Sequence, residues 1–313
     1  MAERVRPPAS VIMTEDYAGL QAQALGLAEA AGLTPRLQVL KPVTPWRWLP
    51  AAFWPTPLRA VGVTPPPETL AIGCGGKAAA VLAALRAPGR QVVQVQHPRL
   101  DPARVDLVVV NRHDRLTGPN VIVTRTALHR ATQARLAQAR AEWAGRLAHL
   151  PRPLVAVLVG GANGRFRLDD ATGQALAAQL AGMMRLDRVG VALTPSRRTG
   201  PSVRRILADA LTPLGAWVWD MAGDNPYFGL LAHADAVVVT IDSVSMVSEA
   251  VATSAPVMLA TLPGESRRIA RFTEGLRADG RVRSFAGRLE MWDCAPLDDT
   301  QAAADEMRQR LGF

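Results

Sequence analysis

Short, continuously apolar runs alternate with alanine-rich stretches along almost the whole chain. Strands that are covered by helices on both faces have unbroken apolar runs of this kind, and strands that alternate with helices form parallel sheets. We therefore predict an α/β protein. The predicted strands are 10–14, 37–40, 70–73, 91–96, 106–110, 121–124, 154–159, 189–194, 216–219, 236–240 and 256–259. The predicted helices are 21–31, 78–86, 127–150, 169–185, 201–211, 243–253 and 298–311.

One interruption divides this pattern into two halves. The sequence Pro151-Arg152-Pro153 ends the long helix, and the alternation restarts with the strand 154–159. A chain of 313 residues has the length of two ordinary domains. We predict two Rossmann-like domains with parallel sheets, residues 1–150 and 151–313, with the last helix packing back on the first domain. Such sheets bind ligands at the carboxyl ends of their strands.

The charge of the chain favours some partners over others. The net charge is +9, but 34 of the 36 basic residues are arginine, a usage that a GC-rich coding sequence also produces. Aromatic residues make up only 5% of the chain, and no aromatic-flanked basic motif of the RNA-binding type occurs, so we expect no nucleic-acid partner. A basic surface favours phosphates or an anionic membrane face.

The sequence also lacks the usual signals for secretion and membrane insertion. No run approaches the roughly 20 apolar residues that a spanning helix needs, and residues 1–10 hold no apolar stretch of the length a secretion signal has. We therefore expect a cytoplasmic protein in which Cys74 and Cys294 are reduced thiols.

The strongest candidate site follows the strand 236–240. The chain turns there and enters a helix through Asp242, Ser243 and Ser245. The free N–H groups and the dipole of such a helix start suit a phosphate, and small hydroxyl residues can cap the helix or bind the anion. Glu249 lies one turn beyond Ser245, where a carboxylate could accept hydrogen bonds from a ribose diol.

The same stretch also has a purely structural interpretation. Ser245 with Ser248, or Met246 with Glu249, could form a capping box that serves only the helix. Both interpretations remain open at this point. The candidate ligand-binding residues of the stretch are Asp242, Ser243, Ser245, Met246 and Glu249.

Two further loops in this half follow predicted strands. Gly160 and Gly161 would let the backbone approach a ligand closely, although a glycine turn after a strand is common. Ser196, Arg197 and Arg198 fit a pyrophosphate by charge and by the fork geometry of arginine, although adjacent arginines are usually a solvated loop. Three loops carrying small or anion-binding residues at strand ends in one half favour a site.

A fourth segment, Asn225-Pro226-Tyr227-Phe228, precedes the strand 236–240. We predict that Asn225 and Tyr227 belong to the same ligand site, with the tyrosine ring stacked on a nucleobase. An ordinary buried tyrosine is the alternative.

The first half offers candidate acid–base residues. Glu15 and Asp16 end the first strand, where an acid or base could face a cleft, although a turn with solvated carboxylates is the simpler interpretation. The loop Gly73–Lys77 lacks the hydroxyl residue that a Walker motif places after its lysine, so we exclude an ATPase.

Metal and serine-hydrolase chemistry have no sequence support. The five histidines are not at metal-ligand spacing, and no Asp-x-Asp pair is present to chelate a metal diphosphate. The chain also lacks the Gly-x-Ser-x-Gly elbow of serine hydrolases. We expect a metal-independent mechanism without a resident cofactor.

A tryptophan-rich segment stands apart from these motifs. Trp46, Trp48 and Trp54 fall within nine residues, together with prolines and Arg47. Such rings beside basic groups suit an anionic membrane interface, and a loop packed on its own domain is the alternative.

These motifs together resemble one family. It is the mitochondrial-fission family known from elongated mitochondria in plants, whose bacterial branch is described as glycosyltransferase-like. The sharpest parts of the resemblance are Thr194–Thr199, Asn225–Phe228, Thr240–Ala250 and the Gly160-Gly161 pair, and Gly19–Ala30 resembles the first loop and helix of the family.

The resemblance implies a GT-B fold, with two Rossmann-like domains and a cleft between them. It assigns the nucleotide sugar to the second domain, with Ser243 and Ser245 at the diphosphate and Glu249 at the ribose. It assigns the acceptor and a catalytic base to the first domain. This chain has Thr14-Glu15-Asp16 where the family often has Thr-Asp-Gly, and Leu20 where a histidine is common.

The function expected from these observations is that of a metal-independent glycosyltransferase. It would transfer a sugar from a nucleoside-diphosphate donor to an envelope glycan or a lipid-linked acceptor, at the inner face of the membrane. A sugar-nucleotide epimerase of the same fold is one alternative. A non-catalytic interaction protein recruited to a membrane is the other, because fold resemblance does not establish activity.

Overall fold

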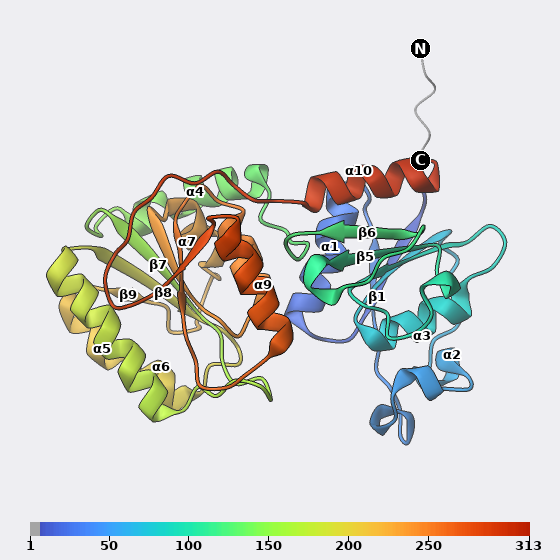
Figure 1. Cartoon of the computed structure of the whole chain (residues 1–313), viewed down its shortest axis with the longest axis horizontal. Helices are drawn as coiled ribbons and strands as arrows, with labels where there is room; N and C mark the ends of the chain where they lie inside the picture. The colour runs from blue at the N-terminus through green and yellow to red at the C-terminus, as the bar shows by residue number, and fades with distance from the viewer. Residues whose placement is uncertain (1–6) are drawn as a thin grey trace, which may run out of the picture. The chain divides into compact units, whose positions relative to one another are not determined.

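Each half of the chain forms a six-stranded parallel sheet with helices on both faces (Figure 1). The computed structural model describes residues 7–313. It divides them into two compact units. The first contains the described residues up to Arg130 and the C-terminal Asp298–Phe313, and the second is Ala131–Leu297.

The sheet of the first unit has the strand order β2-β1-β3-β4-β5-β6. All of its neighbouring strands are parallel, and the strand order reverses between β1 and β3. Its strands are β1 (Ser10–Thr14), β2 (Arg36–Val39), β3 (Leu70–Cys74), β4 (Gln91–Val95), β5 (Leu107–Asn111) and β6 (Val121–Thr124). Its helices are α1 (Ala18–Ala30), α2 (Pro57–Ala60), α3 (Gly76–Leu85) and α10 (Thr300–Leu311).

The sheet of the second unit has the order β12-β11-β10-β7-β8-β9, again all parallel. The strand order reverses between β7 and β10. The strands are β7 (Leu154–Val159), β8 (Gly190–Pro195), β9 (Trp217–Val218), β10 (Ala236–Thr240), β11 (Val257–Ala260) and β12 (Val282–Ser284). The helices are α4 (Gln133–Leu147), α5 (Asp170–Asp187), α6 (Pro201–Leu211), α7 (Tyr227–His233), α8 (Val244–Val251) and α9 (Arg267–Ala278).

Every residue of β7 is buried, because successive side chains point into opposite apolar layers. Val155, Val157 and Val159 pack in the layer formed with α5 and α6, whereas Leu154 and Leu158 pack in the layer that holds α4, α7 and α9. Figure 1 shows α5 and α6 on one side of this sheet and α4 and α7 on the other. The predicted α/β class with two parallel sheets is confirmed, and the continuous apolar runs of the sequence predicted it correctly.

One predicted helix is shorter in the structure, and several elements were not predicted. The stretch expected to be helical over 127–150 is helical only as α4, because the Thr132 hydroxyl accepts the Arg135 N–H at 3.2 Å and caps the helix there. The segment Tyr227–His233, for which no element was predicted, is α7. The prediction also missed α9, whose buried Ile269, Phe272 and Leu276 have helical spacing, and β12, which has only three residues.

The division between the units lies at Arg130/Ala131, whereas the sequence analysis placed it at 150/151. The difference is α4, which packs on α7. A side chain at Gly229 of α7 would lie 2.3 Å from the Trp143 ring of α4, so the two helices are in close contact. The C-terminal helix α10 packs against α1 of the first unit.

Candidate functional site

Three loops meet at the carboxyl edge of the second sheet, where the strand order reverses. They follow β7, β8 and β10, which are adjacent strands. Thr240 at the end of β10 links two of them, because its Oγ1 accepts the N–H of Gly160 at 2.8 Å and donates to Asp242 Oδ1 at 2.7 Å. Reversal points of parallel sheets are the usual ligand-binding positions of such folds.

Asp242 lies at the centre of this loop cluster. Its side chain is fully buried, and Oδ2 accepts the N–H of Gly161 at 3.1 Å and pairs with Arg198 Nη2 at 2.7 Å. Its backbone carbonyl accepts a hydrogen bond from Asn163 Nδ2 at 2.9 Å. Asp242 therefore connects all three loops.

The two glycines after β7 are required by this packing. A Cβ at Gly160 would lie 2.3 Å from Asp242 Oδ2, and a Cβ at Gly161 would lie 2.2 Å from the Arg198 carbonyl oxygen. Real Cβ atoms do not approach other atoms so closely. The close approach that these glycines permit is therefore to the neighbouring loops of the chain itself.

The loop after β8 is tied to the first loop by hydroxyl groups. Ser196 Oγ and Thr199 Oγ1 both donate to the Gly160 carbonyl, at 2.8 and 2.5 Å. Arg198 Nη1 donates to the Gly161 carbonyl at 2.8 Å, and 39% of the Arg198 side chain remains exposed. Arg197 is exposed, so of the two adjacent arginines one is anchored and the other faces solvent.

The helix start after β10 is capped by Ser243. Its side-chain oxygen accepts the Met246 N–H at 3.4 Å, so neither predicted capping box forms the N-terminal cap of α8. Ser245 is half-buried in the first turn, and Met246 packs against the apolar layer beneath.

Glu249 and Tyr227 form a direct pair beside this helix start. The Tyr227 hydroxyl donates to Glu249 Oε2 at 2.5 Å, and Glu249 is buried. Desolvation, and then the adjacent Glu249 charge, raises the pKa of Tyr227 well above its ordinary value, so the phenol remains a donor. Asn225 Oδ1 accepts the Tyr227 N–H at 3.0 Å.

Tyr227 was predicted to stack on a base, with an ordinary buried tyrosine as the alternative. In the structure the residue begins α7, and its ring packs edge-on against Phe228 with centroids 5.4 Å apart. The sequence analysis missed Thr240, Thr199 and Asn163 as site residues. Their signal was a hydroxyl or amide side chain at the end of an apolar strand, as for Thr240, or in the loop that follows one, as for Asn163 and Thr199.

The first unit holds a second polar pair where its own strand order reverses. Glu15 follows β1 and Lys77 lies in the first turn of α3, after β3, and Lys77 Nζ pairs with Glu15 Oε1 at 2.8 Å. Asp16 accepts a hydrogen bond from Gln21 Nε2 at 3.2 Å. Lys77 was not predicted as a site residue, because its loop lacks the hydroxyl residue of a Walker motif.

The tryptophans of the segment 46–55 have different environments. Trp54 is 5% exposed, and its Nε1 donates to the Trp46 carbonyl at 3.1 Å, so the prediction of a membrane-facing Trp54 was wrong. It fills the core of the first unit, and Trp46 packs partly on the same core. Trp48 is 71% exposed, and the Arg47 guanidinium lies 4.2 Å from the centroid of its ring. Phe53 is 74% exposed, although it was not predicted as a membrane-facing residue.

The described residues contain neither a metal-binding cluster nor a membrane-spanning helix. Within residues 7–313, no group of three or more histidine, cysteine, aspartate or glutamate side chains is arranged to hold a metal ion. Every helix in that range is too short or too polar to cross a membrane.

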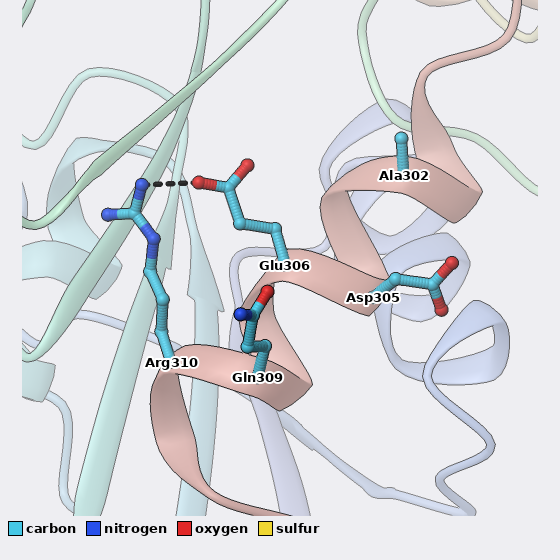
Figure 2. Close-up of a pocket in the computed structure, with 5 residues that line it drawn as sticks. All are labelled: Ala302, Asp305, Glu306, Gln309 and Arg310. Carbon is cyan, nitrogen blue, oxygen red and sulfur yellow. Dashed lines mark hydrogen bonds and ion pairs between the residues drawn. The ribbon is translucent and has the colours of Figure 1, made fainter.

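A surface hollow lies on α10, and none of the predicted residues lines it. Figure 2 shows it with its lining, Ala302, Asp305, Glu306, Gln309 and Arg310, all from this one helix. Glu306 and Arg310 form an ion pair one turn apart. Because a single exposed helix face supplies the whole lining, we assign it no function.

The fold matches that of solved sugar-nucleotide proteins. A UDP-GlcNAc 2-epimerase from Methanocaldococcus jannaschii, in complex with UDP-GlcNAc and UDP, has a TM-score of 0.60 and 9% identity, covering 97% of this chain and 99% of that one. A UDP-glucosyltransferase from Polygonum tinctorium has a TM-score of 0.54 and 13% identity, covering 99% and 100%. At these identities the likeness shows the fold alone, which is the GT-B fold.

Sequence relatives are more specific. The mitochondrial fission protein ELM1 of Arabidopsis thaliana is 34% identical over 276 residues, which cover 77% of this chain and 64% of the Arabidopsis protein. This chain therefore spans less than two thirds of that relative. Residues 18–311 match the sequence model described as Mitochondrial fission ELM1. With nearly its full length matched, the chain belongs to the mitochondrial fission ELM1 family.

Proposed function

We propose that the second unit binds a nucleoside-diphosphate sugar and that the protein is a glycosyltransferase. The observation that carries the proposal is the meeting of three loops at the strand-order reversal, beside a serine-capped helix start, an exposed arginine and a buried carboxylate. Solved neighbours of the same fold are named as complexes with UDP-GlcNAc, UDP or UDP-glucose, which supports this ligand class.

The diphosphate would lie at the start of α8. The first N–H groups of that helix, together with Ser243 and Ser245, would donate to the phosphate oxygens. From the loop after β8, Arg197 would add positive charge and Arg198, which is paired with Asp242, would add N–H donors. These groups act when the bond between the anomeric carbon and the phosphate oxygen breaks, because the leaving diphosphate takes the electron pair and its charge must be stabilised.

The ribose would bind at Glu249. A buried carboxylate accepts hydrogen bonds from a ribose diol well, provided that its orientation is fixed. Tyr227 supplies that orientation through its 2.5 Å bond to Oε2. In this proposal Tyr227 acts through Glu249 rather than by stacking on the base, and Asn225 fixes the start of α7.

The acceptor would bind to the first unit, with Glu15 or Asp16 as the candidate base. A carboxylate can take the proton of an acceptor hydroxyl as the new glycosidic bond forms. Lys77 holds Glu15 at the carboxyl edge of that sheet. The chain's own arginines and helix N–H groups supply the charge compensation, so the proposed reaction needs neither a metal nor a resident cofactor.

We also propose that the first unit binds an anionic membrane, and that the acceptor is lipid-linked or an envelope glycan. The supporting observation is the exposure of Trp48 and Phe53 beside the exposed Arg47, Lys41 and Arg59. Large rings are costly to leave in water, and a membrane interface accepts both rings and arginines. The protein would then act peripherally, on the inner face of the membrane.

A sugar-nucleotide epimerase is the second candidate, because the same donor-binding residues would serve it and a solved neighbour is an epimerase. A panel of nucleoside diphosphates in thermal unfolding tests the shared donor site, since a bound ligand raises the unfolding temperature. Product analysis then separates the candidates: an epimerase converts the donor alone, whereas a transferase needs an acceptor. The transferase should retain activity in EDTA. The absence of nucleoside-diphosphate binding would favour the remaining alternative, a non-catalytic interaction protein recruited to a membrane.

A further inference from the structure

Asp242 was predicted to bind the ligand directly, but its side chain cannot reach a ligand in the structure. Its side chain is fully buried, and Thr240, Gly161 and Arg198 occupy its two carboxylate oxygens. A buried carboxylate is stable only when charges and donors of this kind satisfy it. Its contribution to a ligand site must therefore come through the groups that it holds.

Arg198 is the one of these groups that extends to the surface. Its guanidinium bridges two loops, with Nη1 on the Gly161 carbonyl at 2.8 Å and Nη2 on Asp242 at 2.7 Å. Arginine has five N–H donors, and 39% of this side chain is exposed. Donors therefore remain for an oxyanion outside the cluster, on a guanidinium whose orientation is already fixed.

We infer that Asp242 is a positioning residue that fixes Arg198 as an oxyanion-binding group for the pyrophosphate moiety of the ligand. The inference rests on the proposed donor site and assigns Asp242 a role within it. Fixing the guanidinium before binding removes the entropy cost of ordering a long side chain in the complex. Arg198 and Asp242 together carry no net charge, so the attraction for the anion comes from the exposed Arg197 and the start of α8.

A matched structural pair lies at the opposite edge of the same sheet. Asp235 precedes β10, accepts the Leu154 N–H at 2.6 Å and pairs with Arg152. Each aspartate thus accepts a backbone N–H at one end of β7 and pairs with an arginine, although Asp235 is 29% exposed and has no threonine partner among the described residues. Only Asp242 lies at the carboxyl edge, so Asp235→Asn removes a comparable aspartate–arginine pair without touching the proposed site.

The test measures the binding of inorganic pyrophosphate by titration calorimetry, so that it does not depend on the nucleobase. Asp242→Asn and Arg198→Gln should each weaken binding by about tenfold, the size expected for one hydrogen bond to a charged group. The double variant should bind no more weakly than Arg198→Gln alone, because Asp242 acts only through Arg198. Asp235→Asn should bind pyrophosphate like the parent.

The sign of the Asp242→Asn effect is decisive. If Asp242 had no positioning role, removing its negative charge near an anion site would tighten binding. Equal or tighter binding of pyrophosphate by Asp242→Asn therefore overturns the inference. Additive effects in the double variant overturn it as well. Arg198→Lys tests the same idea on a partly exposed residue without altering the buried carboxylate. It keeps the charge but loses the bridge, and parent-like affinity would overturn the inference.

The parent protein separates the inference from the proposed function. A parent that binds pyrophosphate but no nucleoside diphosphate refutes the nucleotide-sugar proposal and leaves the oxyanion role of Arg198 standing. A parent that does not bind pyrophosphate overturns the inference whatever its nucleotide binding.

Discussion

The hydroxyl of Tyr227 donates to Glu249 Oε2 at 2.5 Å, joining the first turn of α7 to the buried face of α8. The two residues are 22 positions apart in the sequence, so the hydrogen bond links two different helices. The pair fixes a carboxylate next to the helix start where the diphosphate is proposed to bind.

The ribose role of Glu249 predicts a selective loss of nucleotide affinity. Glu249→Gln should weaken UDP binding by roughly 1.5–3 kcal/mol, and Tyr227→Phe by about 1 kcal/mol because it removes a hydrogen bond that orients the carboxylate. Inorganic pyrophosphate should bind both variants like the parent, since it has no ribose. Calorimetric titration measures both ligands, and UDP affinity equal to that of the parent in Glu249→Gln would show that the ribose role is wrong.

Two glycine-to-alanine substitutions, one in the packed loops and one in α5, should change the free energy of unfolding in opposite directions. Gly160→Ala should lower the free energy of unfolding by about 1–3 kcal/mol, because its Cβ would lie 2.3 Å from Asp242 Oδ2. Gly182→Ala in α5 meets nothing within 4 Å and should stabilise by about 0.5–1 kcal/mol through helix propensity. Urea denaturation measures both, and a neutral Gly160→Ala would mean that the loops are not tightly packed.

The exposed rings of the first unit predict membrane binding through Trp48 and Phe53. The parent should co-sediment with vesicles containing anionic lipid, and Trp48→Ser with Phe53→Ser should abolish this without changing thermal stability. Trp54→Ser is the contrasting variant, because a buried tryptophan is lost from the core and the free energy of unfolding should fall by about 3–5 kcal/mol. A parent that ignores anionic vesicles would refute the membrane proposal.

His129 predicts the direction of a pH effect on stability. Burial lowers its pKa, and the charges of Asp298 and Asp299 oppose this only in part. The unfolded chain, with a histidine pKa of about 6.5, therefore binds the proton more readily than the folded protein. Stability is complete above about pH 6.5 and falls as the pH drops toward the lowered pKa of the folded state.

The check is thermal unfolding of the parent and His129→Gln between pH 7.5 and 5.5. The unfolding temperature of the parent should fall more steeply over this range. His149→Gln, at an exposed position, should behave like the parent. Equal slopes for the parent and His129→Gln would contradict the prediction.

Much of the fold could be predicted from the sequence because a buried parallel strand leaves a local signal. The runs 154–159 and 236–240 coincide with β7 and β10, since every residue in them must be apolar or small to lie between two layers of helices. The start of α8 could likewise be predicted from a local signal, the hydroxyl residue Ser243 directly after a strand and a turn. By contrast, α9 was missed although Ile269, Phe272 and Leu276 have helical spacing, because its arginines dominate the composition.

The side-chain pairs could not be predicted in this way. The sequence does not distinguish Arg197 from Arg198, yet it is Arg198 that pairs with Asp242. The two residues are 44 positions apart in the sequence, and the topology of the sheet brings them together. Likewise, Trp48 and Trp54 belong to the same motif, and only the tertiary packing of the first unit buries Trp54 and exposes Trp48. The sequence around Tyr227 predicts neither α7 nor the hydrogen bond to Glu249.

Hydrogen–deuterium exchange of the parent protein, with and without UDP, tests the central claim most directly. The proposal predicts slower exchange in peptides that cover residues 160–167, 196–199 and 241–249, because a bound diphosphate and ribose would restrain these loops and the start of α8. Peptides at the amino edge of the same sheet, around Arg152 and Asp235, should exchange unchanged. The absence of protection in the three loops at saturating UDP, or protection confined to other parts of the chain, would contradict the proposed donor site.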